Sequence, residues 1–257
     1  MAGLALQISL LAMIEVRNLT KKYGDFTAVD GISLEARRGE IFGFLGPNGA
    51  GKTTTIRILA GLSLPTSGTV LIDGLNLATD ALRIKAGIGF VPDRPYLYEK
   101  LTGRELLQFV ASLYGKAWSA CEERAQDLLR YFGIFEWADA RIENFSHGMK
   151  QKLVIVSALI HDPPLLIIDE PMVGLDALAQ KQVKLLFRRL VDEKRTVFLT
   201  THTLSVAEAV CDRIAILNRG RIIASGTTAE LLAAGQPGSA LEDIFLELTY
   251  SDSPAEP

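Results

Sequence analysis

The chain has 257 residues, of which 48% are hydrophobic, so it can bury one large core or one core with an inserted lobe. Its 27 basic and 30 acidic residues leave a net charge of −3, which disfavours nucleic acid as a partner and provides no acidic tail. The two cysteines, Cys121 and Cys211, lie far apart and fit neither a disulfide nor a metal-binding spacing. These features predict a single mixed domain in a reducing compartment such as the cytoplasm.

The chain begins with an apolar stretch, MAGLALQISLLA. This stretch has no basic residue ahead of its apolar part and is too short to cross a bilayer, so it does not resemble a signal peptide. We interpret residues 1–13 as an N-terminal extension, either disordered or interfacial or produced by a misassigned start codon. No later run reaches transmembrane length, so a membrane role would require another chain.

The first half of the chain alternates between strand and helix patterns. IEVRNL, GISLEA and EIFGFLG alternate apolar with polar residues or are rich in β-formers, which predicts strands within residues 14–45. A helix is expected from Lys52, followed by strands at GTVLIDG and IGFV. Pro92 and Pro95 then interrupt regular structure. From residue 102 to residue 160 the apolar positions recur at helical spacing, which predicts an inserted helical lobe.

The second half returns to alternating strands and helices. LLIID and TVFLTTH are short apolar runs typical of strands buried on both faces, and AQKQVKLLFRRLVDE between them is an amphipathic helix. DRIAILNRGRIIASG predicts two strands joined by a turn at residues 218–220. TTAELLAAG and LEDIFLELT predict short helices, and residues 249–257 form a polar tail that we expect to be disordered.

A phosphate-binding motif lies between the third predicted strand and the first helix. Within FLGPNGAGKTTTIRI, residues 46–53 have the spacing GxxxxGKT, whose glycines let successive backbone N–H groups point at phosphate oxygens. A glycine-rich turn without a ligand is the alternative, but the flanking strand and helix are the context that a P-loop needs. The residues expected around the phosphates are Gly46, Pro47, Asn48, Gly49, Ala50, Gly51, Lys52, Thr53 and Thr54.

Two adjacent carboxylates end the strand-like run LLIIDE. Asp169 is expected near Mg²⁺ together with the Thr53 hydroxyl, and Glu170 beside the attacking water. A solvated acidic turn is the alternative, and it is common for such a pair when no P-loop is present. The two motifs together predict an α/β nucleoside-triphosphatase fold without specifying which one.

The segment FSHGMKQ, just ahead of the second carboxylate strand, makes the resemblance specific. Considered alone it could be an ordinary capped helix, because a serine at a helix N-terminus caps it and the first-turn N–H groups bind anions. In this order of motifs, however, the chain resembles the ATP-binding cassette (ABC) ATPases, whose LSGGQ signature stands at this place. Ser146 and Gly148 match that signature, whereas His147 replaces its first glycine and Met149 its glutamine. The resemblance implies that these four residues contact ATP held by a second subunit.

The resemblance covers nearly the whole chain and assigns further roles. Tyr23 in KKYGD matches the aromatic residue that stacks on adenine, although an isolated tyrosine there could also be a surface residue. His202 matches the histidine that senses the γ-phosphate, and Asp176 in GLD matches the loop that links the two active sites. Asp93 in VPDRPYLY stands where the family usually has glutamine, which implies coupling to a membrane partner and a place near the metal.

Aromatic residues and prolines around Asp93 are expected to line a docking groove. A helix from a membrane subunit could insert there, and a rigid surface turn is the alternative explanation of the same residues. The residues concerned are Pro92, Pro95, Tyr96 and Tyr98.

The resemblance also implies an architecture. We expect an α/β fold with a P-loop (RecA-like) core, an N-terminal antiparallel β-subdomain and an inserted α-helical subdomain. The expected ranges are 14–248 for the ATPase domain, with 14–93 and 161–225 as the core, 94–160 as the helical subdomain and 226–248 as C-terminal helices.

The function implied by the resemblance is ATP hydrolysis that powers a membrane transporter. Glu170, His202 and Lys52 would be catalytic, ATP and Mg²⁺ would bind, and a second ATPase subunit, in a homodimer, would complete both sites. The partner would be an integral membrane permease on a separate chain, at the cytoplasmic face of the plasma membrane. The compact chain, with no room for a regulatory domain after the cassette, resembles the ATPases of bacterial exporters. The alternative is a soluble ABC ATPase that acts as a nucleotide-dependent clamp.

Overall fold

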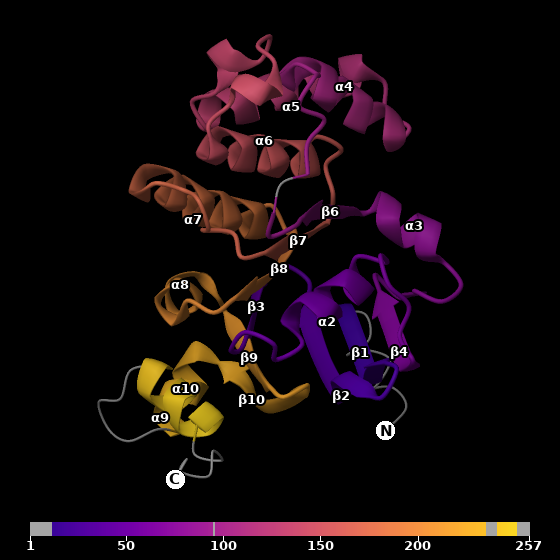
Figure 1. Cartoon of the computed structure of the whole chain (residues 1–257), viewed down its shortest axis with the longest axis vertical. Coiled ribbons are helices and arrows are strands. Elements are labelled where there is room, and N and C mark those ends of the chain that lie inside the picture. The colour runs from indigo at the N-terminus through magenta and orange to yellow at the C-terminus, as the bar shows by residue number, and fades with distance from the viewer. Residues whose placement is uncertain (1–11, 95, 235–240, 251–257) are drawn as a thin grey trace.

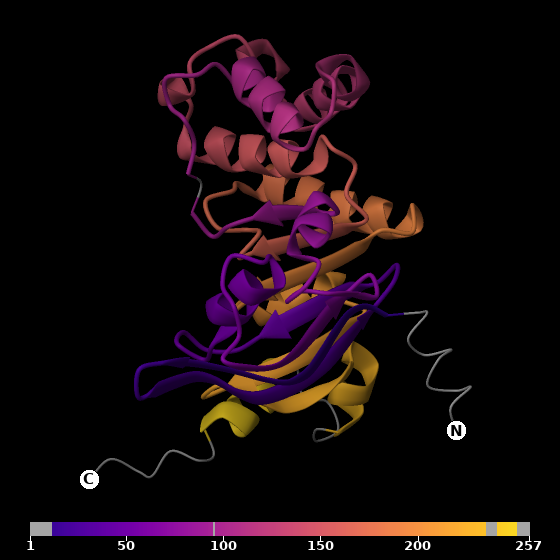
Figure 2. The same ribbon diagram turned by 90° about the vertical axis from the view of Figure 1, so that its right-hand side faces the viewer.

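The computed structural model describes residues 12–94, 96–234 and 241–250, which form two β-sheets and a lobe of helices (Figure 1). The first sheet is antiparallel, with strand order β2-β1-β4-β5. Its strands are β1 (Ala12–Tyr23), β2 (Phe26–Arg37), β4 (Ser67–Ile72) and β5 (Leu75–Asn76). Figure 2 shows β1 and β2 as a long twisted hairpin, which is the expected N-terminal antiparallel β-subdomain.

The second sheet has six strands in the order β10-β9-β3-β8-β7-β6. The five strands from β9 to β6 are parallel, and β10 is antiparallel to β9. Every residue of β3, β7 and β8 is buried, because helices and the first sheet cover both faces. The strands are β3 (Ile41–Leu45), β6 (Ile88–Val91), β7 (Leu165–Asp169), β8 (Thr196–Thr201), β9 (Arg213–Asn218) and β10 (Arg221–Thr227).

Apolar side chains pack on both faces of this central sheet. On one face Phe42 stacks on Phe198 with ring centroids 5.5 Å apart, and this cluster joins the antiparallel sheet to α2 (Lys52–Leu59). The other cluster joins the sheet to the helical lobe and to α7 (Ala177–Asp192). The lobe, at the top of Figure 1, consists of α4 (Gly103–Leu113), α5 (Trp118–Tyr131) and α6 (His147–Leu159), with 3₁₀ turns at Phe135–Trp137 and Ile142–Asn144.

The fold expected from the sequence is confirmed: a P-loop core, an antiparallel sheet and an inserted helical lobe. Two short helices were not predicted, α3 (Ala81–Ala86) and α8 (Leu204–Val210). The C-terminal helices α9 (Thr228–Ala234) and α10 (Leu241–Tyr250) were predicted. Within the described ranges, no helix combines the length and apolar character needed to cross a bilayer.

Three expected boundaries differ from the structure by two residues. Strand β1 starts at Ala12 and the side chain of Met13 is buried, so the chain is ordered before residue 14. Strand β10 continues to Thr227 because it stays paired with β9 beyond residue 225. Helix α10 includes Thr249 and Tyr250, which were expected in the disordered tail. Residues 1–11 of the extension and 251–257 of the tail lie outside the described part of the chain.

Candidate functional site: a nucleotide cavity at the carboxyl edge of the sheet

The P-loop connects β3 to α2, and close backbone contacts require glycine at two of its positions. A β-carbon on Gly46 would lie 2.3 Å from the Leu217 carbonyl oxygen, and one on Gly51 would lie 2.5 Å from the Ala28 carbonyl oxygen. Gly51 also has φ = +110°, which L-residues rarely adopt. No side chain caps the start of α2, so its first-turn N–H groups can bind an anion.

The Lys52 side chain folds back over this loop. Its ammonium group donates hydrogen bonds to the carbonyl oxygens of Gly46 at 2.7 Å and Pro47 at 3.1 Å. Burial lowers the pKa of Lys52, and the negative charges of Glu170 and Asp169 oppose that change. The lysine is therefore held close to the loop that is expected to surround the phosphates.

Asp169 ends β7 and is almost completely buried. Its carboxylate accepts a hydrogen bond from the Thr53 hydroxyl at 3.3 Å and another from the Thr200 hydroxyl on β8. Burial raises the pKa of Asp169, the bond from Thr200 lowers it, and the nearby charge of Asp93 raises it. The sheet thus brings together Thr53, Asp93 and Asp169, the three residues that the sequence proposed for Mg²⁺.

Glu170 follows directly and is held by three donors. Its Oε1 accepts from the Nδ1 of His202 at 2.7 Å and from the backbone N–H of His202 at 3.0 Å. Its Oε2 accepts from the Thr201 hydroxyl at 3.2 Å. Glu170 has φ = +49°, an uncommon value for a residue with a side chain, which marks a backbone held by its surroundings.

These groups surround one cavity of about 360 Å³ at the carboxyl ends of the parallel strands. The sequence did not identify Phe26 and Ala28 as part of it, because nothing in the local pattern of β2 distinguishes them. The lining residues are Phe26, Ala28, Asn48, Gly49, Gly51, Lys52, Thr53, Thr54, Asp93, Asp169, Glu170 and His202.

Tyr23, expected to stack on adenine, does not line this cavity. It lies opposite Phe26 across the β1–β2 hairpin, is half exposed, and has the Lys21 ammonium 5.0 Å from its ring centroid. The aromatic side chain at the cavity is that of Phe26, which is 65% exposed.

The oxygen groups in the cavity fit Mg²⁺. A hydroxyl and carboxylates are the hard ligands that this ion prefers, and it commonly takes its remaining ligands from substrate phosphates and water. Among the described residues, no group of three or more His, Cys, Asp or Glu is placed to hold a metal by itself.

The signature residues lie outside the cavity of their own chain. Ser146 caps α6 by accepting a hydrogen bond from the Met149 N–H at 3.2 Å, as its position at a helix start requires. A β-carbon on Gly174 would lie 2.3 Å from the His147 ring, and one on Gly148 would lie 3.3 Å from the Gly174 carbonyl oxygen.

Asp176, expected to link two active sites, caps α7. Its carboxylate accepts a hydrogen bond from the Ala179 N–H at 2.7 Å.

Two residues of the expected docking groove, Tyr96 and Tyr98, are strongly exposed. The ring of Tyr98 packs edge-on against Phe109, with the centroids 5.6 Å apart. Pro92 is half-buried, and Pro95 lies outside the described residues.

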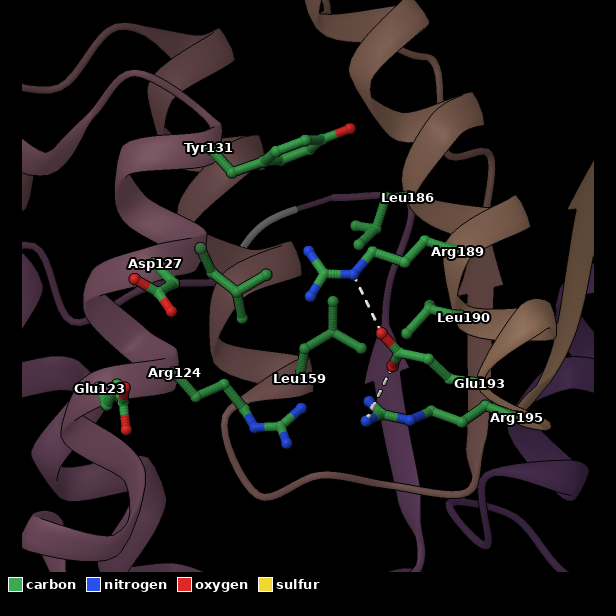
Figure 3. Close-up of a pocket in the computed structure, with 11 residues that line it drawn as sticks. Glu123, Arg124, Asp127, Tyr131, Leu159, Leu186, Arg189, Leu190, Glu193 and Arg195 are labelled. Carbon is green, nitrogen blue, oxygen red and sulfur yellow. Dashed lines mark hydrogen bonds and ion pairs between the residues drawn. The ribbon is translucent and has the colours of Figure 1, made fainter.

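A second cavity, of about 270 Å³, separates α5 of the helical lobe from α7 of the core. Figure 3 shows Arg124 and Arg189 extending into it from opposite sides. Two of the lining residues, Arg124 and Arg195, both pair with Asp162, the first at 3.0 Å, so one carboxylate joins the lobe to the core. None of the residues predicted to bind nucleotide lines this cavity.

Comparisons with known proteins agree with this geometry. Residues 29–173 match the family model described as ABC transporter. The chain is 41% identical over 239 residues to the linearmycin resistance ATP-binding protein LnrL of Bacillus subtilis, covering 93% of this chain and 75% of LnrL. It is 38% identical over 242 residues to YbhF of Escherichia coli, a probable multidrug ABC transporter ATP-binding protein, but spans only 42% of that protein's length.

Solved structures give the same result. An ATP-binding subunit of an ABC transporter superposes with a TM-score of 0.87 at 36% identity, covering 92% of this chain and 99% of that one. The cassette MJ0796, in a dimeric post-hydrolysis state bound to ADP and Pi, superposes with a TM-score of 0.77 at 28% identity, covering 84% of this chain and 98% of its own. The chain therefore belongs to the ABC transporter family, as one of its ATP-binding ATPase cassettes.

Proposed function

We propose that this chain hydrolyses ATP as one of two subunits that close around two nucleotides and drive transport through a separate membrane permease. The observation that carries the proposal is the arrangement at the cavity, where the P-loop, Lys52 and Glu170 surround one space of nucleotide size. Glu170 is the general base in this proposal, because its carboxylate is fixed beside the expected position of the γ-phosphate.

Each residue has a defined part in the reaction. Lys52 stabilises negative charge on the β- and γ-phosphates once these replace its present carbonyl partners. Glu170 accepts the proton of the attacking water, and His202 orients Glu170 through its ring and backbone nitrogens. When bound, Mg²⁺ neutralises phosphate charge, and Thr53, Asp169 and Asp93 are the residues that would hold it.

A second subunit is needed because the signature lies apart from the cavity in the same chain. Ser146, His147, Gly148 and Met149 line no part of it, yet the N-terminus of α6 can bind an anion. In our proposal these residues contact ATP bound to the P-loop of a second copy, and the loop ending at Asp176 joins the two sites. The dimeric state of the similar cassette MJ0796 supports this assembly.

In this proposal the chain acts at the cytoplasmic face of the plasma membrane, and its permease exports the substrate. The names of two relatives support export. LnrL is named for linearmycin resistance and YbhF for multidrug transport. The exposed Tyr96 and Tyr98, close in sequence to Asp93 at the cavity, form the surface proposed for the permease. Asp93 would couple that surface to the nucleotide.

The test is affinity purification of a tagged Glu170→Gln chain from gently solubilised membranes in the presence of ATP, with mass spectrometry of the bound proteins. Recovery of an integral membrane protein with several hydrophobic spans supports the transporter proposal. Recovery of this chain alone, or of ribosomes, contradicts it and leaves an ATPase without a permease.

A further inference from the structure

Strand β8 ends with two consecutive threonines, and each contacts one of two consecutive carboxylates, Asp169 at the end of β7 and Glu170 directly after it. The Thr200 hydroxyl donates to Asp169, and the Thr201 hydroxyl donates to Glu170 at 3.2 Å. Both threonines are buried, with 0% and 2% of their surfaces exposed. Buried hydroxyls on a central strand need partners, and here the partners are the two groups with the most direct role in the proposed chemistry.

The pairing follows from the register of the parallel strands. Asp169 lies directly beside Thr200 in the β7–β8 ladder, and the Glu170 N–H continues that ladder by donating to the Thr200 carbonyl at 3.1 Å. Asp169 and Thr200 are paired in the ladder, so their side chains share one face of the sheet, and the Thr201 side chain points to the opposite face, where it reaches Glu170.

The direction of the Thr201 hydroxyl is fixed by its neighbours. Its oxygen accepts a hydrogen bond from the backbone N–H of Thr203 at 3.0 Å, which leaves the hydroxyl proton to point at the Glu170 Oε2. The other carboxylate oxygen, Oε1, already accepts both hydrogen bonds from His202. Thr201 is thus the side chain that holds Oε2, and together with the two His202 donors on Oε1 it fixes the rotation of the carboxylate about its final bond.

We propose that Thr201 is a positioning residue, which orients Glu170 so that a lone pair of Oε2 faces the attacking water. This inference rests on the proposed function, in which Glu170 is the general base. Without the Thr201 hydroxyl, only Oε1 is held, by His202, so the carboxylate spends less time in the reactive orientation and turnover falls without a matching loss of ATP binding.

The experiment compares five variants of the full chain by steady-state phosphate release and by equilibrium ATP binding. Thr201→Val keeps the shape and removes the hydroxyl, and Thr201→Ser restores the hydroxyl. Thr196→Val is the matched control, because Thr196 is also buried and lies at the opposite end of β8. Its hydroxyl accepts a hydrogen bond from the Gly39 N–H at 3.0 Å and donates one to the Arg37 carbonyl at 3.3 Å. The fourth variant is Glu170→Gln, and the fifth combines Glu170→Gln with Thr201→Val.

We expect Thr201→Val to lower kcat about 10- to 100-fold while the ATP dissociation constant changes by less than about twofold. Thr201→Ser should recover most of the turnover, and Thr196→Val should retain it. Adding Thr201→Val to Glu170→Gln should produce no further loss, since the group being oriented is gone.

The outcomes separate this inference from the proposed function. Full turnover in Thr201→Val, together with loss in Glu170→Gln, overturns the positioning role alone. Full turnover in Glu170→Gln contradicts the general-base assignment itself. Equal losses in Thr201→Val and Thr196→Val would mean that the effect comes from a weakened strand and would overturn the inference.

Discussion

The imidazole ring of His147 lies against Gly174, so closely that a β-carbon on Gly174 would come within 2.3 Å of the ring Cδ2 atom. This contact joins the start of α6 to the loop that leads into α7. It pairs the residue that replaces the first glycine of the family signature with a glycine that has φ = +76°. The two loops proposed to face a second subunit are therefore in contact within one chain.

We expect Gly174→Ala to lower the free energy of unfolding by more than the strain of a positive φ, which costs about 1–2 kcal/mol. The matched control is Gly115→Ala, because Gly115 has φ = +65° but open space where the new methyl group would lie. Urea denaturation of both variants isolates the contact with His147. Adding His147→Gly should remove the excess loss in Gly174→Ala, and equal losses at both glycines would show that the ring moves aside without cost.

Glu170→Gln should reduce turnover by about 10²–10⁴-fold, the usual contribution of a general base. The glutamine side chain keeps its size and one acceptor oxygen but cannot take a proton. ATP-dependent association of two chains, measured by size-exclusion chromatography with light scattering, should persist. Loss of association along with turnover would indicate that Glu170 is needed for assembly instead of for the chemical step.

Phe26→Ala and Tyr23→Ala distinguish the two candidates for contact with the nucleotide base. Phe26 lines the cavity and Tyr23 does not, so we expect the larger loss of ATP affinity, about 10-fold, in Phe26→Ala. ADP affinity should fall equally, because the base is common to both nucleotides. Isothermal titration calorimetry measures both. A larger loss in Tyr23→Ala would support the prediction made from the sequence and would require Tyr23 to move on binding.

His161 should make stability depend on pH in a defined direction. Its ring stacks on Tyr114 with centroids 3.6 Å apart, its Nε2 contacts the Ile88 carbonyl at 3.2 Å, and burial lowers its pKa to about 4. The unfolded chain takes up a proton near pH 6.5, so it binds more protons than the folded chain between pH 6.5 and 4. The stabilisation from the neutral ring is present above pH 6.5 and is lost as the pH falls toward 4, by about 3 kcal/mol in full.

His161→Gln tests this by removing the titrating group. The variant should be less stable at pH 7.5, because the stacking on Tyr114 is lost, but should lose less stability than the original chain between pH 7.5 and 4.5. Urea denaturation at both pH values provides the comparison. Parallel pH dependence in the two proteins would contradict the assignment to His161.

The sequence predicted those parts of the site that lie within continuous motifs. GxxxxGKT and LLIIDE can be recognised in the sequence alone, because the glycine spacing and the adjacent carboxylates that define them are local patterns. Phe26 and Thr201 could not be found in this way. They join the site through the hairpin β1–β2 and the ladder between β7 and β8, which are relations between distant segments.

The same reason explains what was missed in the fold. Long periodic segments such as α7 were predicted, whereas α3 and α8 span six and seven residues and offer too few turns for a pattern to emerge. Strand β1 starts early because Met13 packs into the core. Met13 follows an apolar stretch, so nothing in the sequence marks it as part of the core.

The strand order also has a consequence for the width of the catalytic site. The P-loop follows β3 and the two carboxylates follow β7, and β8 lies between these strands. Two interstrand spacings of about 4.8 Å therefore separate the phosphate-binding loop from Glu170 by roughly 10 Å of sheet. Side chains cross part of that separation, since the Thr53 hydroxyl lies 3.3 Å from the Asp169 carboxylate. Strand β8 thus acts as a spacer whose residues are all buried, and the distance between the two motifs depends on the packing of the sheet interior.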